Sequence, residues 1–304
     1  MKRIIACVLA LALCVTVCCS CVAEKTKNEK ILLVASFYPV YIFTLNIVDG
    51  IDEITVECMA EQNVGCLHDY QILSKDARLI SDSDAFIING AGMEEFLEDV
   101  YMSVDDISVI DSSKNIEVIE ACHEEHHEED EHHHHSVNSH IWMSVKNAIV
   151  QCENIADELT VMYPQYKEQI ENNKSKYITR LKILDDELEL KSQNIKGANI
   201  ITFHESFDYL ANDYSLNILA KVESHEGGEP SAKGLAELTE IIKENKVNVL
   251  FIEPDYKGSA ATILSNETGV EICVINPVIN GELSVTAYED IMRENMKSIL
   301  KAVN

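Results

Sequence analysis

Eight short apolar segments, arranged in two groups of four, constrain the fold of this chain more than any other feature of its sequence. Stretches with helical spacing of apolar residues lie between them. Strands that alternate with helices of about ten to fifteen residues are typical of parallel sheets with helical crossovers. The sequence therefore predicts an α/β protein with two lobes, each a mostly parallel sheet flanked by helices. The expected strands are residues 31–37, 54–60, 85–89 and 107–111 in the first lobe, and 198–203, 216–222, 247–253 and 271–276 in the second.

The stretch between the two groups, from residue 164 to about 193, predicts one long helix. It contains no glycine, and its only proline, Pro164, stands at the start, where a helix does not need the missing N–H. Its apolar residues recur mostly at intervals of three, four or seven, which places them on one face. A helix of about thirty residues spans roughly 45 Å, so we expect a rigid connection between the lobes. The residues on this face are Tyr166, Ile170, Tyr177, Leu181, Leu184 and Leu188.

The first twenty residues have the layout of a secretory signal peptide, with Lys2 and Arg3 before an apolar stretch and then small residues. Cys21 follows, and the next residues are polar, which is typical of a bacterial lipoprotein whose cysteine becomes the lipidated N-terminus. Cys18 stands where such signals usually carry leucine, and Cys19 is an alternative lipid acceptor. We therefore expect an extracytoplasmic protein that is anchored to the cell membrane through Cys21.

These features together predict the organisation of the chain. No later apolar run is long enough to span a bilayer. The net charge of −28 would repel nucleic acid, which is excluded as a partner. The predicted parts are a signal peptide (1–20), a tether (21–30), an N-terminal lobe (31–163) with a His-rich loop (121–138), a linking helix (164–195) and a C-terminal lobe (196–304).

The cysteines of the predicted mature chain have no CxxC spacing, so neither a disulfide framework nor a cysteine zinc knuckle is indicated. One pair, such as Cys58 with Cys66, could be bridged, and the sequence leaves this open. The cysteines concerned are Cys58, Cys66, Cys122, Cys152 and Cys273.

Seven of the eleven histidines lie in one low-complexity run, interleaved with acidic residues, at 121–135. The run is too polar to form a core, so we expect a mobile loop inserted in the first lobe. Such a loop can bind zinc in many arrangements, but each costs ordering entropy and is weaker than a preformed site. We interpret the run as an accessory metal-binding loop, with Cys122 as a further soft ligand. Its histidines are His123, His126, His127, His132, His133, His134 and His135.

Three of the other four histidines stand where a ligand site is favoured. His204 directly follows a predicted strand of the second lobe, and His68 follows a strand and turn of the first. His140 lies between the His-rich run and a predicted helix. Ligands of open parallel sheets bind outside the carboxyl ends of the strands, so three such histidines from both lobes indicate one shared site. His225 has no such context, and we interpret it as a surface loop residue.

A series of short motifs runs along nearly all of the predicted mature chain: SFYPVY (36–41), CLHDYQ (66–71), NGAGMEEFL (89–97), HIW (140–142), TFHESFDYLANDYSL (202–216), EPS (229–231) and FIEPDYKGSAATILSNETGV (251–270). In this order they resemble the zinc- and manganese-binding lipoproteins that supply bacterial ABC metal importers. The resemblance implies two α/β lobes joined by a long backbone helix, and a receptor rather than an enzyme. It also implies a monomer that binds Zn²⁺ and docks on an ABC permease with its ATPase.

The resemblance makes His68, His140 and His204 the metal ligands. Three neutral imidazoles suit zinc, whereas manganese members of the family carry a carboxylate where this chain has His204. A manganese or iron receptor is therefore the alternative within the family. The fourth ligand is an acidic residue near the NP segment or water, and here that segment departs from the usual pattern. Glu282 is the acidic candidate; Glu253 is the fallback and is also interpreted as a hydrogen-bonding residue that fixes its loop.

A second alternative comes from another class of protein. A three-histidine zinc site with one open position also activates water in some hydrolases. The sequence contains no GxSxG turn, and Glu205 is the only local candidate for a general base. A zinc-dependent hydrolase is therefore less favoured than a receptor.

Overall fold

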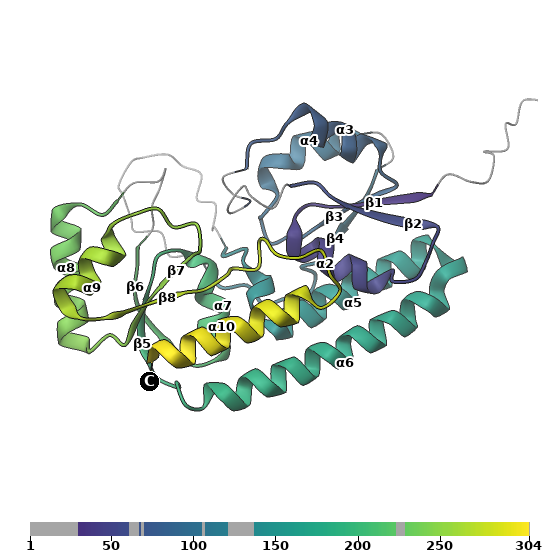
Figure 1. Cartoon of the computed structure of the whole chain (residues 1–304). Helices are drawn as coiled ribbons and strands as arrows, with labels where there is room; N and C mark the ends of the chain where they lie inside the picture. The colour runs from purple at the N-terminus through teal and green to yellow at the C-terminus, as the bar shows by residue number, and fades with distance from the viewer. Residues whose placement is uncertain are drawn as a thin grey trace, which may run out of the picture.

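The computed structural model describes residues 30–60, 67, 70–104, 107–120, 137–222 and 229–303. Within these residues it contains two four-stranded sheets in which all neighbouring strands are parallel (Figure 1). Each predicted strand is present with slightly tighter bounds, and the predicted α/β class with two lobes is confirmed. The strands are β1 (Ile31–Ala35), β2 (Ile54–Cys58), β3 (Ala85–Ile88), β4 (Ser108–Asp111), β5 (Asn199–Thr202), β6 (Asn217–Lys221), β7 (Val249–Ile252) and β8 (Glu271–Val274).

The described helices fall into three sets. Those of the first lobe are α2 (Tyr38–Ile47), α3 (Ser74–Asp82) and α4 (Glu98–Met102), with the 3-10 turn η2 (Glu95–Leu97). Those of the second lobe are η5 (Glu205–Phe207), α7 (Asp208–Asp213), α8 (Ala232–Asn245) and α9 (Ala260–Thr268). The connecting set is η3 (Ile141–Met143), α5 (Val145–Met162), η4 (Pro164–Tyr166), α6 (Lys167–Ser192) and α10 (Ala287–Val303).

Both sheets have the same topology, with strand order β2-β1-β3-β4 in one lobe and β6-β5-β7-β8 in the other. The first strand of each lobe therefore lies inside its sheet, between two parallel neighbours. In the second lobe β5 pairs with β7, with Thr202 opposite Phe251, so both strands end at the same edge. Residues that directly follow β5 and β7 therefore become neighbours there, which is where open parallel sheets bind ligands.

The predicted linking helix is present as η4 followed by the 26 residues of α6, a span of roughly 39 Å. Its predicted apolar face is buried, apart from Tyr166, which is half-buried at the start. Spacing alone therefore identified the residues that α6 packs inward, because a helix beside a core must present one continuous apolar side. The fully or almost fully buried members are Ile170, Tyr177, Leu181, Leu184 and Leu188.

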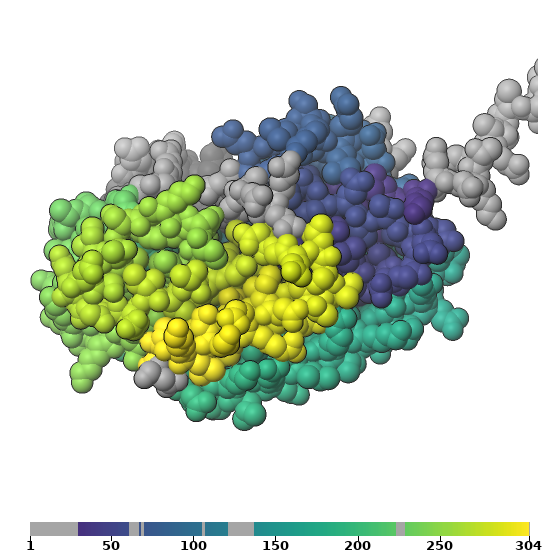
Figure 2. Space-filling view, in the orientation of Figure 1, coloured from purple at the N-terminus to yellow at the C-terminus, as the bar shows by residue number. Residues whose placement is uncertain are grey.

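Two other helices, α5 and α10, pack along the predicted linking helix (Figure 1). α10 follows the last strand of the second lobe, yet it contacts α2 of the first lobe as well as α6 and β8. The hydroxyl of Tyr288 donates to the carbonyl of Trp142 over 2.8 Å, and Arg180 Nε donates to Glu289 Oε1 over 2.8 Å. Figure 2 shows the C-terminal segment between the purple N-terminal lobe and the rest of the second lobe. The predicted long helix therefore joins the lobes along the chain, and α10 adds packing between them.

The turn after β3 explains why the NGAGMEEFL motif takes this form. The buried Glu94 carboxylate accepts hydrogen bonds from Ser36 Oγ (2.7 Å), Asn89 N (2.8 Å) and Gly90 N (3.0 Å). Burial raises the pKa of Glu94 to about 7, against the lowering effect of these donors. Gly90 has a φ of +77°, and a Cβ there would lie 2.0 Å from Asp111 Oδ1. Glycine is therefore required at this position, and Glu94 ties the ends of β1 and β3 together.

Two further findings concern membrane-spanning helices and the cysteine thiols. Among the described residues, no helix has the length and apolar character needed to cross a membrane. Cys58, Cys152 and Cys273 are free thiols, whereas Cys66 and Cys122 lie outside the described residues. Burial raises the pKa of Cys58 and of Cys273 to about 12, so neither is a ready thiolate ligand near neutral pH.

Two adjacent residues of α6 test the importance of its buried face. Leu184 is completely buried, whereas Ile183 is 58% exposed. We expect Leu184→Ala to lower the free energy of unfolding by about 2–5 kcal/mol, because it removes apolar contacts and leaves a cavity. Ile183→Ala should change it by no more than about 0.5 kcal/mol. Urea denaturation of the metal-free protein measures both, and equal losses would contradict the assignment of the faces.

Candidate metal centre

His140 reaches the centre from the first lobe, on the segment that leads into η3. The residue is completely buried. Its backbone N–H donates to Asn138 Oδ1 over 3.0 Å, and its ring Nδ1 lies 2.9 Å from the same oxygen. Because an amide oxygen only accepts, the ring proton belongs on Nδ1. The lone pair of the neutral imidazole is then on Nε2, the nitrogen that a metal ion would bind.

His204 reaches the centre from the second lobe, directly after β5 and the buried Phe203. Its ring Nδ1 lies 2.9 Å from Glu253 Oε1, which also accepts from Ser206 Oγ over 2.9 Å. Glu253 directly follows β7, the strand that pairs with β5, so the parallel sheet brings the two side chains together. The carboxylate lies on the Nδ1 side of the ring and so helps to orient it.

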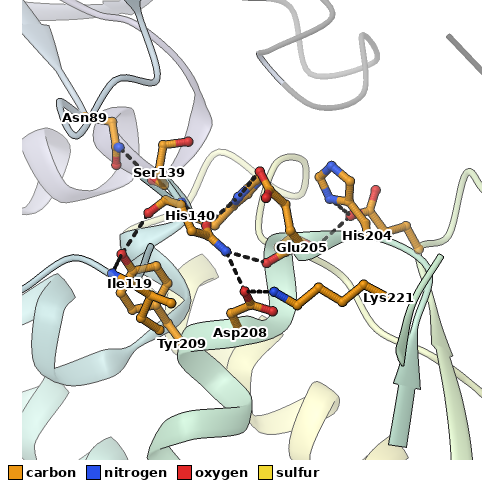
Figure 3. A network of polar contacts seen from close by, with 12 residues as sticks. Asn89, Ile119, Ser139, His140, His204, Glu205, Asp208, Tyr209 and Lys221 are labelled. Carbon is orange, nitrogen blue, oxygen red and sulfur yellow. Dashed lines mark hydrogen bonds and ion pairs between the residues drawn. The ribbon is translucent and has the colours of Figure 1, made fainter. Parts of the chain in front are cut away.

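The two rings lie close together although they come from different lobes (Figure 3). The centroids of His140 and His204 are 5.0 Å apart, and the ring planes are almost perpendicular at 87°. The His140 ring also lies 5.1 Å from the ring of the buried Trp142. Each ring thus has an oxygen atom 2.9 Å from its Nδ1, the position that outer-shell groups take beside metal-binding histidines.

Most of the other predicted metal-binding histidines lie outside the part of the chain that the structure describes. His68 lies outside the described residues, as do His225 and the seven histidines of the run 121–135. Within the described ranges, no group of three or more His, Cys, Asp or Glu residues is arranged to hold a metal ion, and His68 is not part of that search. The three-histidine site therefore stays a prediction, of which the described structure brings two members together.

The two acidic candidates differ in position. Glu282 is exposed in the segment before α10, and its backbone carbonyl accepts from the hydroxyl of Tyr38 over 2.6 Å. Its role as a fourth ligand stays a prediction. Glu253 accepts a hydrogen bond from Ser206 Oγ, in agreement with its interpretation as a hydrogen-bonding residue, and its carboxylate also lies 2.9 Å from His204 Nδ1.

The sequence analysis missed the polar residues that support His140. The Asn138 amide donates to the Glu205 carbonyl over 2.8 Å and to Asp208 Oδ2 over 3.0 Å, and Lys221 Nζ pairs with the same carboxylate oxygen (Figure 3). Glu205 Oε1 is 3.9 Å from His140 Nδ1. The asparagine two residues before HIW was the available signal, since its short side chain can reach the next backbone N–H and ring.

The comparisons with known proteins assign the family. A family described as zinc-uptake complex component A, periplasmic, matches residues 33–302. The chain belongs to this family. The zinc-uptake family match covers both lobes and the helices that join them, including every described residue of the candidate centre.

Individual relatives agree with this assignment. The chain is 32% identical over 297 residues to the zinc-binding lipoprotein AdcA of Streptococcus pneumoniae, covering 95% of this chain and 59% of the relative. It is 31% identical over 287 residues to the high-affinity zinc uptake system protein ZnuA of Bacillus subtilis, covering 91% and 89%. The solved Zn(II)-bound ZnuA-like domain of S. pneumoniae AdcA matches with a TM-score of 0.73 at 30% identity, over 90% of this chain and 99% of that one. The chain thus spans a little over half the length of the streptococcal relatives.

The ion pair between Asp208 and Lys221, beside the centre, is expected to stabilise the fold. Asp208→Ala removes the carboxylate that accepts from both Lys221 and Asn138, and Asp208 is 5% exposed. We expect the free energy of unfolding to fall by about 3 kcal/mol, because a largely buried ammonium group loses its partner. Urea denaturation of the metal-free protein measures the change.

An exposed ion pair is the matched control. Glu237 pairs with Lys233 over 3.4 Å on α8, with side chains that are 60% and 87% exposed. Glu237→Ala should alter the free energy of unfolding by no more than about 0.5 kcal/mol. A loss for Asp208→Ala as small as this would show that the buried pair is not important for stability.

Proposed function

We propose that this chain is an extracytoplasmic zinc receptor that delivers Zn²⁺ to an ABC importer. The observation that carries the proposal is the approach of the His140 and His204 ring centroids to 5.0 Å, with an oxygen atom 2.9 Å from each Nδ1. This arrangement directs two Nε2 lone pairs to the ion from two lobes. His68 supplies the third imidazole, and Glu282 or water completes a tetrahedral site.

Zinc is favoured over manganese by the chemistry of the donors. Imidazole nitrogen suits zinc and other late transition metals, whereas manganese prefers carboxylate and water oxygens. Glu253, the acidic group beside His204, is engaged at Nδ1, where it orients the ring. The relatives named as zinc-binding and zinc-uptake proteins support the same choice. Metal analysis of protein purified without added metal separates zinc from manganese or iron.

The partners follow from this role. The loaded receptor docks on a membrane permease, and the associated ATPase drives import. The receptor acts as a monomer, and release requires a change in the surroundings of the ion. Because α6 links the lobes along the chain and α10 packs against elements of both, the change is a small one in the loops rather than a wide opening.

The His-rich run is an accessory in this proposal. It captures zinc or responds to its concentration and passes the ion to the preformed site between the lobes. The residues that flank it, Glu120 and Val137, form an antiparallel bridge. Val137 lies three residues before His140 in the sequence.

The ranking of the two metal-binding elements is testable. We expect His140→Ala to weaken zinc binding by more than about 100-fold, since loss of an outer partner of a ligand already costs about 10–100-fold. Deletion of residues 123–135 should have a much smaller effect. It leaves residues 121, 122 and 136 between the bridge partners Glu120 and Val137, a length suited to a short hairpin loop.

Competition with a chromogenic zinc chelator measures both affinities, and calorimetry gives the number of ions bound. The deletion variant should bind fewer ions at unchanged high affinity. If the deletion reduces the highest affinity more than His140→Ala does, the run is the main site and the proposal is wrong.

Anchoring through Cys21 is a separate part of the proposal. Cys21→Ser removes the thiol that would carry the lipid, so we expect the protein to move from the membrane fraction to the soluble fraction. Detergent phase partition of cells that express each form measures the shift. Cys19→Ser is the control and should remain with the membrane, and the opposite pattern would assign the anchor to Cys19.

A further inference from the structure

We propose that Asn138 is a positioning residue that fixes the ring proton of His140 on Nδ1 and couples this ring to the second lobe. The inference rests on the proposed function, in which His140 binds the ion. It concerns a residue that does not touch the metal and acts through His140.

The hydrogen bonds of Asn138 use both ends of its amide. Oδ1 accepts from the backbone N–H of His140 over 3.0 Å and lies 2.9 Å from its Nδ1. Nδ2 donates to the Glu205 carbonyl over 2.8 Å and to Asp208 Oδ2 over 3.0 Å. The side chain is completely buried, so these partners take the place of water.

The network determines the orientation of the amide. In the flipped orientation Nδ2 would face the backbone N–H of His140, and Oδ1 would face two oxygen acceptors. Both contacts would be repulsive, so Oδ1 belongs on His140 and Nδ2 on the second lobe. His140 Nδ1 therefore donates, and Nε2 keeps the lone pair.

Asparagine suits this position better than aspartate. A carboxylate at residue 138 would still accept from His140, but its second oxygen would lie against Asp208 Oδ2 and the Glu205 carbonyl. Lys221 Nζ donates to Asp208 Oδ2 over 2.5 Å, so this oxygen acts as an acceptor for both Lys221 and Asn138. The Asp208–Lys221 pair of the second lobe therefore favours a side chain at residue 138 that can donate a hydrogen bond.

The backbone of Asn138 is held by the second lobe as well. Tyr209 on α7 donates its hydroxyl to the Asn138 carbonyl over 2.7 Å and accepts from Ile119 N over 2.9 Å. The Asn138 N–H donates to the Ile119 carbonyl over 2.8 Å. Burial raises the pKa of Tyr209, so the hydroxyl keeps its proton and remains a donor. One tyrosine thus joins the two segments that flank residues 121–136.

These contacts connect the ring of His140 to the arrangement of the lobes. Asn138 and His140 lie on a first-lobe segment, whereas Glu205, Asp208 and Tyr209 belong to η5 and α7. A shift of α7 away from this segment removes the donors and acceptors that hold Asn138. The acceptor for His140 Nδ1 is then no longer fixed, so the tautomer and direction of a zinc ligand respond to the second lobe.

Four variants test the inference. Asn138→Ala removes both functions of the side chain, and Asn138→Asp keeps the acceptor but introduces repulsion with Asp208. In the double variant Asn138→Asp with Asp208→Asn, the repulsion between two carboxylates is removed and the amide at residue 208 can donate to residue 138, although the Glu205 carbonyl still faces an acceptor. Because Glu205 Oε1 is 3.9 Å from His140 Nδ1, Asn138→Ala is also made with Glu205→Ala, which prevents replacement of the lost acceptor.

Two measurements are made on each variant. Nitrogen-15 NMR of the imidazoles in metal-free protein reports the His140 tautomer, and chelator competition reports zinc affinity. We expect Asn138→Ala to move His140 from the Nδ1–H form toward the Nε2–H form and to weaken zinc binding by about 10–100-fold. Asn138→Asp should keep the Nδ1–H form but bind zinc more weakly. The double variant should bind about tenfold more tightly than Asn138→Asp, as expected for residues in contact.

Asn173→Ala is the matched control. Asn173 is also buried, and its amide donates to the carbonyls of Ile47 and Asp49 at the end of α2. The Asn173→Ala variant should have a lower free energy of unfolding but an unchanged His140 tautomer. An unchanged tautomer in Asn138→Ala/Glu205→Ala would overturn the inference, as would a double variant no better than Asn138→Asp. Zinc affinity that survives His140→Ala would instead refute the proposed function, so the two failures are distinguishable.

Discussion

The contact between the His140 segment and α7 is the interaction on which the rest of the centre depends. His204 is placed by its own sheet, because β5 and β7 are paired and Glu253 follows β7. His140 does not follow a strand of the sheet; its segment is held by Asn89, which donates to the Ser139 carbonyl, and by Asn138 with its partners in the second lobe. The two halves of the centre are therefore built differently: one is part of a rigid sheet edge, and the other depends on hydrogen bonds between lobes.

The polar character of this contact has a cost and a use. Burying the Asp208–Lys221 pair removes two charges from water, and such pairs are often no more stabilising than apolar groups of the same size. Polar partners, however, accept a neighbour only in the correct orientation, which apolar packing does not require. The network therefore contributes more to the orientation of His140 than to the stability of the fold. An apolar substitute could join the lobes but could not specify which ring nitrogen carries the proton.

The sequence predicted the parts of this molecule that arise from local patterns. The eight strands and the buried face of α6 were predicted because apolar residues repeat along neighbouring positions. His140 and His204 were singled out because each stands next to a predicted element and within a recognisable motif. Asn138, Asp208 and Lys221 were missed because their contacts join residues far apart in the chain and leave no periodic signal. The packing of α10 against the first lobe was missed for the same reason, since an amphipathic helix does not indicate which surface it covers.

For the proposed receptor, the distribution of apolar contacts restricts how a bound ion could be released. A single buried cluster includes residues of both sheets and of α5, α6 and α10, among them Leu33, Leu184 and Phe251. Separating the lobes would expose such side chains, at about 1.5–3 kcal/mol for each large one. Breaking a hydrogen bond that water can replace costs only about 0.5–1.5 kcal/mol. The conformational change that alters the centre at the smallest cost in free energy is therefore a local loss of the contacts around Asn138. The helices between the lobes stay in place. A docked partner that draws α7 away by a small distance would weaken the hold on His140 without opening the protein.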